Sequence, residues 1–334
     1  MSAGGSEHRA GGSEGARSLL SSVRGHGDPA ADTGWEGHPP RMGFFTDTSV
    51  CIGCKACEVA CKEWNQVPED GLLFTGMSFD NTQGLSADSW RHVAFIEQRK
   101  PIADSQANFQ HGAGAGGHGS GTLVQLDLPA APAAPGFRPA LDGDPAGDFR
   151  WLMSSDVCKH CTDAACLDVC PTGALFRTEF GTVVVQADVC NGCGYCVPAC
   201  PYGVIGKRED DGRVFKCTLC YDRIGVGMEP ACAKACPTDS IQFGELAQLR
   251  ERASERVQRL QEAGVLDARL YGDDTDDGVG GAGAFFLLLD EPEVYGLPPA
   301  PVATTRYLPA MWRGAAVAAG ALLGAVAVSV AGRR

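Results

Sequence analysis

The hydrophobic residues of this chain fall into short runs separated by turn residues, a pattern that predicts small strands rather than long ones. Residues 44–46 and 240–243 are expected to form single strands. Residues 90–98 alternate between apolar and polar side chains and predict a half-buried strand. Residues 284–289 are apolar throughout and predict a buried strand.

Two further pairs of short apolar runs predict hairpins, because each pair flanks a turn signal. The first pair, residues 174–178 and 182–186, encloses Gly181. The second pair, residues 204–207 and 214–216, encloses an Asp-Gly turn.

Helical periodicity is confined to three segments of the chain. Residues 58–64 predict a short helix, and residues 245–263 predict a longer amphipathic helix with Gly264 at its C-cap. Residues 308–331 are apolar over a length that crosses a bilayer, with Arg313 near one end. A buried soluble helix is the alternative for this last segment, but its position at the C-terminus favours a single transmembrane helix that anchors the chain in the cell membrane.

Composition sets two other segments apart. Residues 1–41 are rich in Gly, Ser and charged side chains and predict a disordered tail without the apolar stretch of a signal peptide. Residues 64–149 contain Gly-rich and Ala/Pro-rich stretches and predict an insertion that is partly disordered. The formal net charge of −13 argues against nucleic acid as a partner.

Cysteine dominates the candidate chemistry, because the chain contains 16 cysteines in four runs of four. The first and third runs have the spacing C-x2-C-x2-C-x3-C. The second has a slightly longer middle gap, and the fourth has a long gap before its third cysteine. The runs are Cys51, Cys54, Cys57 and Cys61; Cys158, Cys161, Cys166 and Cys170; Cys190, Cys193, Cys196 and Cys200; and Cys217, Cys220, Cys232 and Cys236.

This spacing is typical of bacterial ferredoxins, in which three cysteines of a run hold one cubane cluster and the fourth ligates its neighbour. Glycines such as Gly192 and Gly194 would let the backbone approach a cluster closely. A disulfide scaffold and a structural zinc protein are the alternatives. Four neighbouring runs with ligand spacing favour iron–sulfur clusters over both.

Four runs in this order resemble the four-cluster iron–sulfur subunits of molybdopterin oxidoreductases. Residues 41–68 and 159–205 most closely resemble the beta subunit of membrane-bound formate dehydrogenase, which is also similar in having one C-terminal membrane helix. The resemblance covers about residues 42–243. The N-terminal tail and residues 100–149 depart from the family pattern.

The resemblance implies an α+β fold of two bacterial-ferredoxin-like dicluster modules, with a large insertion, a C-terminal helical extension and one transmembrane helix. Residues 42–63 together with 205–244 would form module A, and residues 150–204 would form module B. Residues 245–307 would form a helix and a C-terminal arm.

The resemblance also implies which cysteines hold each of four [4Fe–4S] clusters. The first and fourth runs would share two clusters, and the second and third runs the other two. The implied sets are Cys51, Cys54, Cys57 and Cys236 (cluster 1); Cys61, Cys217, Cys220 and Cys232 (cluster 2); Cys158, Cys161, Cys166 and Cys200 (cluster 3); and Cys170, Cys190, Cys193 and Cys196 (cluster 4). Nitrate-reductase-type relatives have Trp at the position of Cys193, so four four-iron clusters are expected here.

The function implied by the resemblance is electron transfer. The partners would be a molybdopterin catalytic (alpha) subunit as donor and an integral membrane quinone-reducing subunit as acceptor, with the globular part outside the cytoplasm. No catalytic residue is assigned, because the chain has no nucleotide-binding motif in a convincing context and no spare thiol. The same role in a polysulfide, thiosulfate or dimethyl-sulfoxide reductase, or in a hydrogenase, is the alternative.

Overall fold

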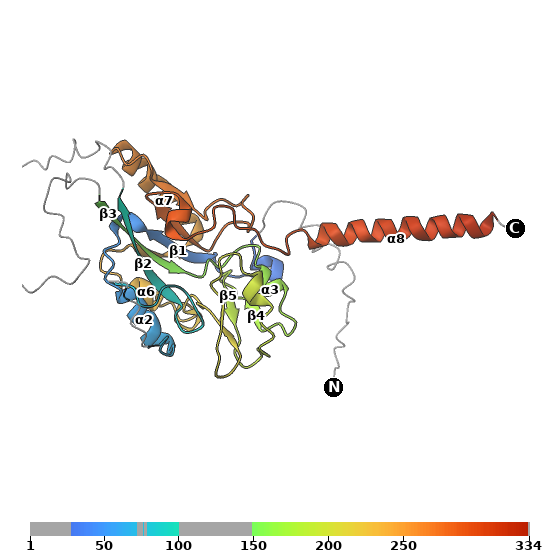
Figure 1. The fold of residues 1–334 in the computed structure, drawn as a ribbon, viewed down its shortest axis with the longest axis horizontal. Helices are drawn as coiled ribbons and strands as arrows, with labels where there is room; N and C mark the ends of the chain where they lie inside the picture. The colour runs from blue at the N-terminus through green and yellow to red at the C-terminus, as the bar shows by residue number, and fades with distance from the viewer. Residues whose placement is uncertain (1–27, 72–75, 77–78, 100–148, 333–334) are drawn as a thin grey trace, which may run out of the picture. The chain divides into compact units, whose positions relative to one another are not determined.

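The computed structural model describes residues 28–71, 76, 79–99 and 149–332 (Figure 1). The chain divides into two units, residues 1–96 with 153–334, and residues 97–152. In the second unit, only the ends of two strands are described, and there Arg150 Nε donates a hydrogen bond to Gln98 Oε1 at 2.8 Å. Most of the insertion predicted for residues 64–149 therefore lies outside the described residues.

A four-stranded sheet forms the frame of the larger unit, in the order β8 (Ile241–Glu245), β1 (Met42–Asp47), β10 (Ala284–Leu288) and β9 (Arg269–Tyr271). The strands predicted for residues 44–46, 240–243 and 284–289 are confirmed. Strand β1 pairs antiparallel with β8 and parallel with β10. The C-terminal segment thus completes the sheet that the first strand begins.

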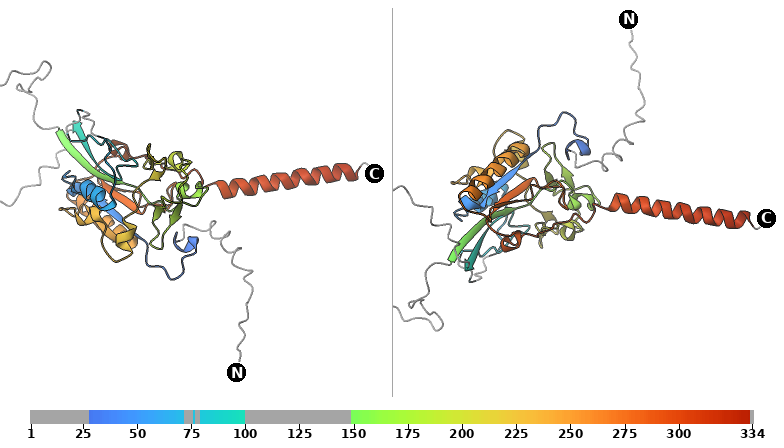
Figure 2. Two further views of the ribbon diagram at one scale, coloured as in Figure 1. Left: turned by 90° about the horizontal axis from the view of Figure 1, so that it is seen from below. Right: turned by 90° about the horizontal axis from the view of Figure 1, so that it is seen from above.

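Helix α7 (Leu246–Glu262) lies along this sheet in both turned views (Figure 2). Its predicted apolar face packs on the sheet, where Leu249 and Ala253 are buried beside Phe45 and Phe285. The two phenylalanine rings stack at a centroid distance of 5.3 Å. The amphipathic pattern of this helix therefore predicted its packing correctly.

Three two-stranded ladders complete the described strands. Both predicted hairpins are confirmed, as β4 (Leu175–Arg177) with β5 (Val183–Val185) and as β6 (Gly206–Lys207) with β7 (Val214–Phe215). The third ladder joins β2 (Arg91–Arg99), which was predicted, to β3 (Phe149–Val157). Strand β3 was not predicted from the sequence.

Short helices accompany the cysteine runs and pack in two pairs. Helix α2 (Ala56–Asn65) of the first run packs on α6 (Ala231–Lys234) of the fourth. Helix α3 (Ala165–Asp168) of the second run packs on α4 (Cys196–Ala199) of the third. A fifth short helix, α5 (Tyr221–Ile224), follows Cys220. The predicted helix over residues 58–64 is confirmed as part of α2.

The N-terminal segment makes specific contacts before residue 42, within the tail that its composition predicted to be disordered. Residues 1–27 lie outside the described residues, but residues 28–41 include a 3-10 turn, Ala31–Thr33. Trp35 Nε1 donates a hydrogen bond to the carbonyl of Arg177 at 2.9 Å. The predicted disordered tail of residues 1–41 is therefore wrong for residues 28–41, because a hydrogen bond to a distant hairpin is invisible in local composition.

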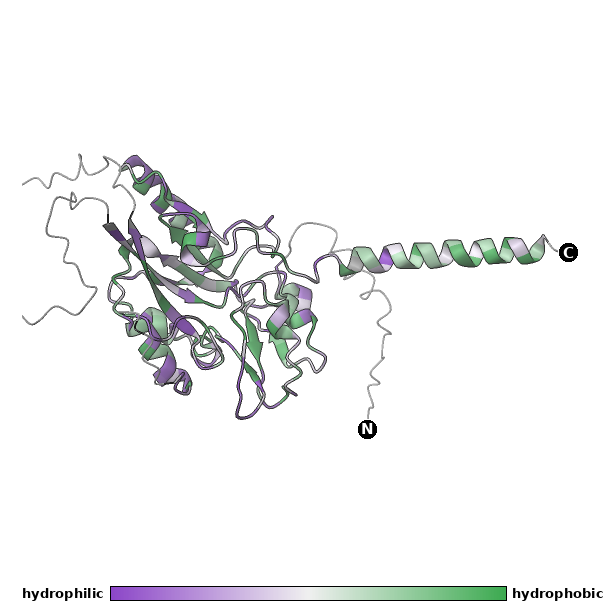
Figure 3. Ribbon diagram, viewed as in Figure 1, coloured by the Kyte–Doolittle hydropathy of each residue, from purple (hydrophilic) through white to green (hydrophobic). Residues whose placement is uncertain are grey.

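The C-terminal helix has the bounds that its apolar run predicted. Helix α8 (Leu308–Ala331) contains one charged residue, Arg313, and is otherwise apolar or small in character (Figure 3). Residues 310–331 are long and apolar enough to cross a membrane, and no part of this span is buried. The residues of this span are therefore exposed in the described part of the chain.

Candidate iron–sulfur sites

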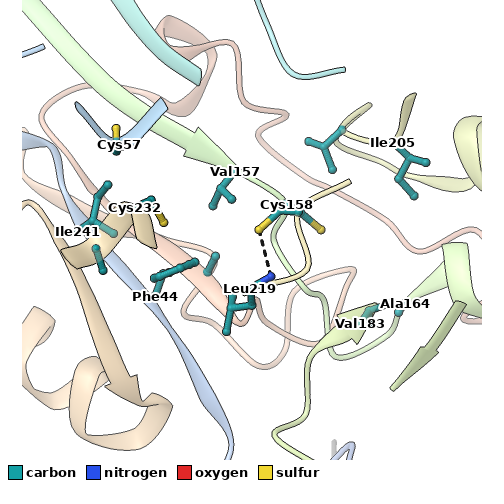
Figure 4. Close-up of a cluster of buried hydrophobic side chains, with 14 of the residues drawn as sticks. Phe44, Cys57, Val157, Cys158, Ala164, Val183, Ile205, Leu219, Cys232 and Ile241 are labelled. Carbon is teal, nitrogen blue, oxygen red and sulfur yellow. Dashed lines mark hydrogen bonds between the residues drawn. The ribbon is translucent and has the colours of Figure 1, made fainter. Parts of the chain in front are cut away.

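All sixteen cysteines are described, and all are free thiols. Five of them belong to one hydrophobic core cluster with Phe44, Val157 and Leu219, and five others pack against this cluster as partly buried side chains. Figure 4 shows Cys57, Cys158 and Cys232 among the buried hydrophobic side chains of this cluster. The disulfide alternative is thereby excluded, and most of the thiols line the interior of the chain.

The first set implied by the resemblance lines one cavity. Cys51, Cys54 and Cys57 of the first run meet Cys236 of the fourth run around about 290 Å³ of empty space. Two hydroxyl groups lie beside these thiols, Ser155 Oγ at 3.2 Å from Cys57 Sγ and Thr238 Oγ1 at 3.8 Å from Cys236 Sγ. Four thiols and these two hydroxyl groups therefore surround this cavity.

The second set is the most deeply buried. Asn65 Nδ2 lies 3.7 Å from Cys61 Sγ and 3.8 Å from Cys220 Sγ, so one amide group contacts thiols from the first and fourth runs. Burial, and then repulsion from the thiols of Cys217 and Cys232, raises the pKa of Cys61. The last cysteine of the first run thus lies among those of the fourth.

The third set also lines one cavity. Cys158, Cys161 and Cys166 of the second run meet Cys200 of the third run around about 370 Å³ of empty space. Burial raises the pKa of Cys166 to about 12, and the thiols of Cys158 and Cys200 also raise it. This cavity has the same three-plus-one composition as the first one.

The fourth set gathers around Cys196. Burial raises the pKa of Cys196 to about 11, and the neighbouring thiols of Cys170, Cys190 and Cys193 contribute to the increase. Cys193 is exposed, as is Cys54 of the first set. The first and fourth sets therefore each bring one thiol to the surface.

Neighbouring thiols also connect the sets to one another. Cys232 of the second set raises the pKa of Cys57 in the first, after burial as the main cause. Burial, and then the Cys158 thiol of the third set, raises the pKa of Cys217 to about 12. Cys196 of the fourth set acts on Cys166 in the same way. Each set thus has a thiol close enough to act on the pKa of a thiol in a neighbouring set.

Gly192 is required by a close contact that was not predicted from the sequence. Its φ is +71°, and an added Cβ would lie 2.5 Å from the carbonyl oxygen of Gly212. The close approach that requires glycine is therefore to the turn of the β6–β7 hairpin. At Gly194, whose φ is +76°, no atom lies within 4 Å of an added Cβ, so the left-handed backbone alone favours glycine.

Several polar residues beside the thiols were missed by sequence reasoning. Arg91, Asn65 and Ser155 each lie within hydrogen-bonding distance of a cysteine sulfur. Lys159 and Lys216 line the third cavity, and each is about 1% exposed. The available signal was a charged residue beside a cysteine, as at Lys159 and Lys216. Arg91, the first residue of the alternating strand β2, carried no such local signal.

The donor set fits four-iron clusters. Thiolate sulfur is the ligand that such clusters require, and two of the sets already surround cavities. In the described ranges, no three or more His, Cys, Asp or Glu side chains are arranged to hold a single metal ion. Burial raises the pKa of thiols such as Cys57, Cys166 and Cys217, so their binding to iron as thiolates must release protons.

The fold and the thiol sets define a ferredoxin-like protein with two dicluster domains. Two family models described as 4Fe-4S dicluster domain match residues 50–174 and 149–246. The chain therefore carries four [4Fe–4S] clusters and has the predicted fold class.

Curated relatives narrow the family further. The iron–sulfur subunit of the nitrate-inducible formate dehydrogenase of Escherichia coli (strain K12) is 36% identical over 80% of this chain and 76% of its own length. The formate dehydrogenase iron–sulfur subunit of Haemophilus influenzae is 35% identical over 79% of the chain and 70% of its own length. A subunit of the anaerobic dimethyl sulfoxide reductase of E. coli is 31% identical over 64% of the chain and 77% of its own length. The chain belongs to the family of formate dehydrogenase iron–sulfur subunits, which are electron-transfer subunits of multi-subunit enzymes.

Proposed function

We propose that this chain passes electrons from a formate-oxidising molybdopterin subunit, with molybdenum or tungsten, to a membrane subunit that reduces quinone. The observation that carries the proposal is the unbroken series of neighbouring thiols between the exposed Cys54 and the exposed Cys193. The [4Fe–4S] cluster in each set supplies one-electron transfer. The similarity to formate dehydrogenase subunits supports formate as the source of electrons.

The proposed ligands are the four sets described above, each with three cysteines from one run and one from another. Two cavities with this composition support the first and third sets. Asn65, which contacts both Cys61 and Cys220, supports the second. The thiols that gather around Cys196 support the fourth. The pairing of α2 with α6 and of α3 with α4 supports the grouping of the four runs into modules A and B.

Contacts of the C-terminal arm support cluster 4 as the membrane-proximal end. Thr305, three residues before α8, donates a hydrogen bond from Oγ1 to Asp168 in the second run. Ala303 is buried against Ala165 and Ala199, on the short helices α3 and α4. The chain therefore leaves for α8 from the part that holds clusters 3 and 4, which favours electron exit there and entry at cluster 1.

We further propose that α8 is a single-pass anchor in the cell membrane and that the globular part lies outside the cytoplasm. The apolar length of α8 and the absence of burial along it support the anchor. Its glycines face no side chain within 4 Å, so they are available for close packing against helices of a membrane partner. The family resemblance supports this side of the membrane.

The test is purification of the tagged chain from its native host in mild detergent, under anaerobic conditions. We expect a catalytic subunit and an integral membrane subunit to co-purify, with about sixteen irons on this chain. Formate should reduce its clusters, as followed by EPR, and the complex should then reduce a quinone analogue. The separated chain should carry iron but should not oxidise formate.

The competing substrate class has a specific observation in its favour, the similarity to a dimethyl sulfoxide reductase subunit. If dimethyl sulfoxide oxidises the dithionite-reduced clusters of the complex while formate fails to reduce them, the reductase role replaces the formate role. Zinc in place of iron would overturn both.

A further inference from the structure

Arg91 occupies an unusual position between the first two thiol sets. It lies on β2, is 2% exposed, and donates a hydrogen bond from Nη2 to Cys232 Sγ at 3.3 Å. Its guanidinium also lies over the ring of Phe44, at 4.9 Å from the ring centroid. A cation is thus held inside the core, in contact with a proposed ligand of cluster 2.

The other side of the same guanidinium reaches the first set through Ser155. Arg91 Nη1 donates to the carbonyl of Ser155 at 3.1 Å and to Ser155 Oγ at 3.2 Å. Ser155 Oγ in turn lies 3.2 Å from Cys57 Sγ. Because Ser155 Oγ accepts from Arg91, its own hydrogen is free to point at the sulfur. Cys232, Arg91, Ser155 and Cys57 therefore form a continuous hydrogen-bonded bridge.

The charge of Arg91 has no carboxylate partner in the described part of the chain. Its hydrogen-bond acceptors there are the two oxygens of Ser155 and the sulfur of Cys232. A buried cation without a compensating negative charge is strongly destabilising. Cys232, which accepts a hydrogen bond from Arg91, and Cys57, which Arg91 reaches through Ser155, would supply this negative charge when they hold iron as thiolates. The cation would then be stabilised by proposed ligands of two clusters.

The two buried lysines beside the third cavity are different. Lys159 Nζ binds the Asp156 carboxylate and the carbonyl of Val157. Lys216 Nζ donates to the carbonyls of Val183 and Cys217. Neither ammonium group donates a hydrogen bond to a cysteine sulfur among the described residues. Of these three buried cations, only Arg91 contacts a proposed ligand atom directly.

We propose that Arg91 and Ser155 form a positioning bridge that raises the reduction potentials of clusters 1 and 2 together. The inference rests on the proposed ligand sets. Reduction adds negative charge to a cluster, so a fixed cation and hydrogen bonds to its sulfurs favour the reduced form. Cluster 2 receives the charged hydrogen bond directly, and cluster 1 receives it through the Ser155 hydroxyl.

The test is a redox titration of all four clusters, followed by EPR, in the whole complex carrying Arg91→Gln or Ser155→Ala. Arg91→Gln should lower two of the four midpoint potentials. For the more affected cluster, the equilibrium constant for reduction should fall at least tenfold, which corresponds to a decrease of about 59 mV for one electron. Ser155→Ala should lower only one of the same two potentials, because it removes a single neutral hydrogen-bond donor. The equilibrium constant for reduction of that cluster should fall about fivefold.

Arg91→Lys and Ser154→Ala are the matched controls. Lysine keeps the positive charge but lacks the planar guanidinium group. Arg91→Lys should therefore lower the two midpoint potentials less than Arg91→Gln does. Ser154 is buried next to Ser155 but donates no hydrogen bond to a sulfur among the described residues, so Ser154→Ala should shift no potential.

The outcomes separate this inference from the proposed function. Four unshifted potentials in an Arg91→Gln complex with wild-type iron content would overturn the bridge, and so would an equal shift of all four. If Arg91→Gln loses iron, four unshifted potentials in the Ser155→Ala complex would overturn the bridge instead. Failure of the proposed function would appear in the wild-type complex, as clusters that formate cannot reduce.

Discussion

The cysteines of the first and fourth runs are supported by a sheet, whereas those of the second and third runs are supported by hairpins. Strands β1 and β8 of the first region belong to the four-stranded sheet that α7 covers. In the second region, β4 and β5 contain three residues each and pair only with one another. We call these the sheet region and the hairpin region.

This difference predicts different sources of stability for regions with the same cysteine chemistry. An isolated two-stranded hairpin is at best marginally stable in water, whereas a sheet covered by a helix has a core of its own. The free energy of metal binding becomes folding free energy where the protein frame is weak. We therefore infer that the hairpin region depends on its clusters more than the sheet region does.

Iron removal should give the largest effect and the most direct test of this comparison. After oxidative loss of the clusters and chelation, amides of β4 and β5 should lose most of their protection from hydrogen exchange. Amides of β1 and β10 should stay protected, because their neighbours Phe45 and Phe285 remain packed. Hydrogen exchange with mass spectrometry measures both regions in one sample. Equal loss of protection in the two regions would contradict the comparison.

The next largest effect should come from single ligand substitutions. Cys61 is 6% exposed, so Cys61→Ala should abolish one cluster and remove about four irons per chain. Cys170 is only partly buried, and Cys170→Ala should leave a vacant position that an added thiol can reach. Iron analysis and EPR with and without a small thiol check this. If the small thiol restores the cluster in Cys61→Ala as completely as in Cys170→Ala, that result would be inconsistent with the difference in burial between the two sites.

Local patterns were sufficient for most of the elements of both regions. The apolar runs predicted β1, β8, β10, both hairpins and α7, and they predicted α8 with its observed bounds. Cysteine spacing identified the candidate ligands, because a ligand run is a local feature of the chain. The pairing of the runs came only from the family resemblance.

Contacts between distant segments could not be predicted in the same way. The parallel pairing of β1 with β10 joins Phe44 to Ala284, and no periodicity reports a partner so far along the chain. The contact of Arg91 with Cys232 joins residues 141 positions apart. The alternation around Arg91 predicted a strand, but which buried group its side chain meets depends on the tertiary fold.

A smaller effect should separate the two regions by packing alone. Phe45→Ala removes a ring that is 1% exposed and stacks on Phe285, so we expect a loss of about 3–5 kcal/mol in the free energy of unfolding. Phe176→Ala in β4 removes a partly exposed ring with an edge contact to Tyr221, and about 1 kcal/mol is expected. Denaturant titration of cluster-loaded protein measures both losses. A larger loss for Phe176→Ala would reverse the assignment of the sheet region as the better packed one.

The smallest effect should come from the contact that ties the C-terminal arm to the hairpin region. Thr305→Val removes the hydrogen bond to Asp168, whose carboxylate stays hydrated, so the cost should be about 1 kcal/mol or less. Cluster content and potentials should not change, because no proposed ligand lies beyond Cys236. Hydrogen exchange of the amides at residues 303–306 should increase, whereas exchange within β1 and β10 should not. The exposed neighbour Thr304, as Thr304→Val, is the matched control and should leave exchange unchanged. If Thr305→Val alters the sheet region as much as the arm, the arm is not held by the hairpin region alone, and the support for cluster 4 as the membrane-proximal end is weakened.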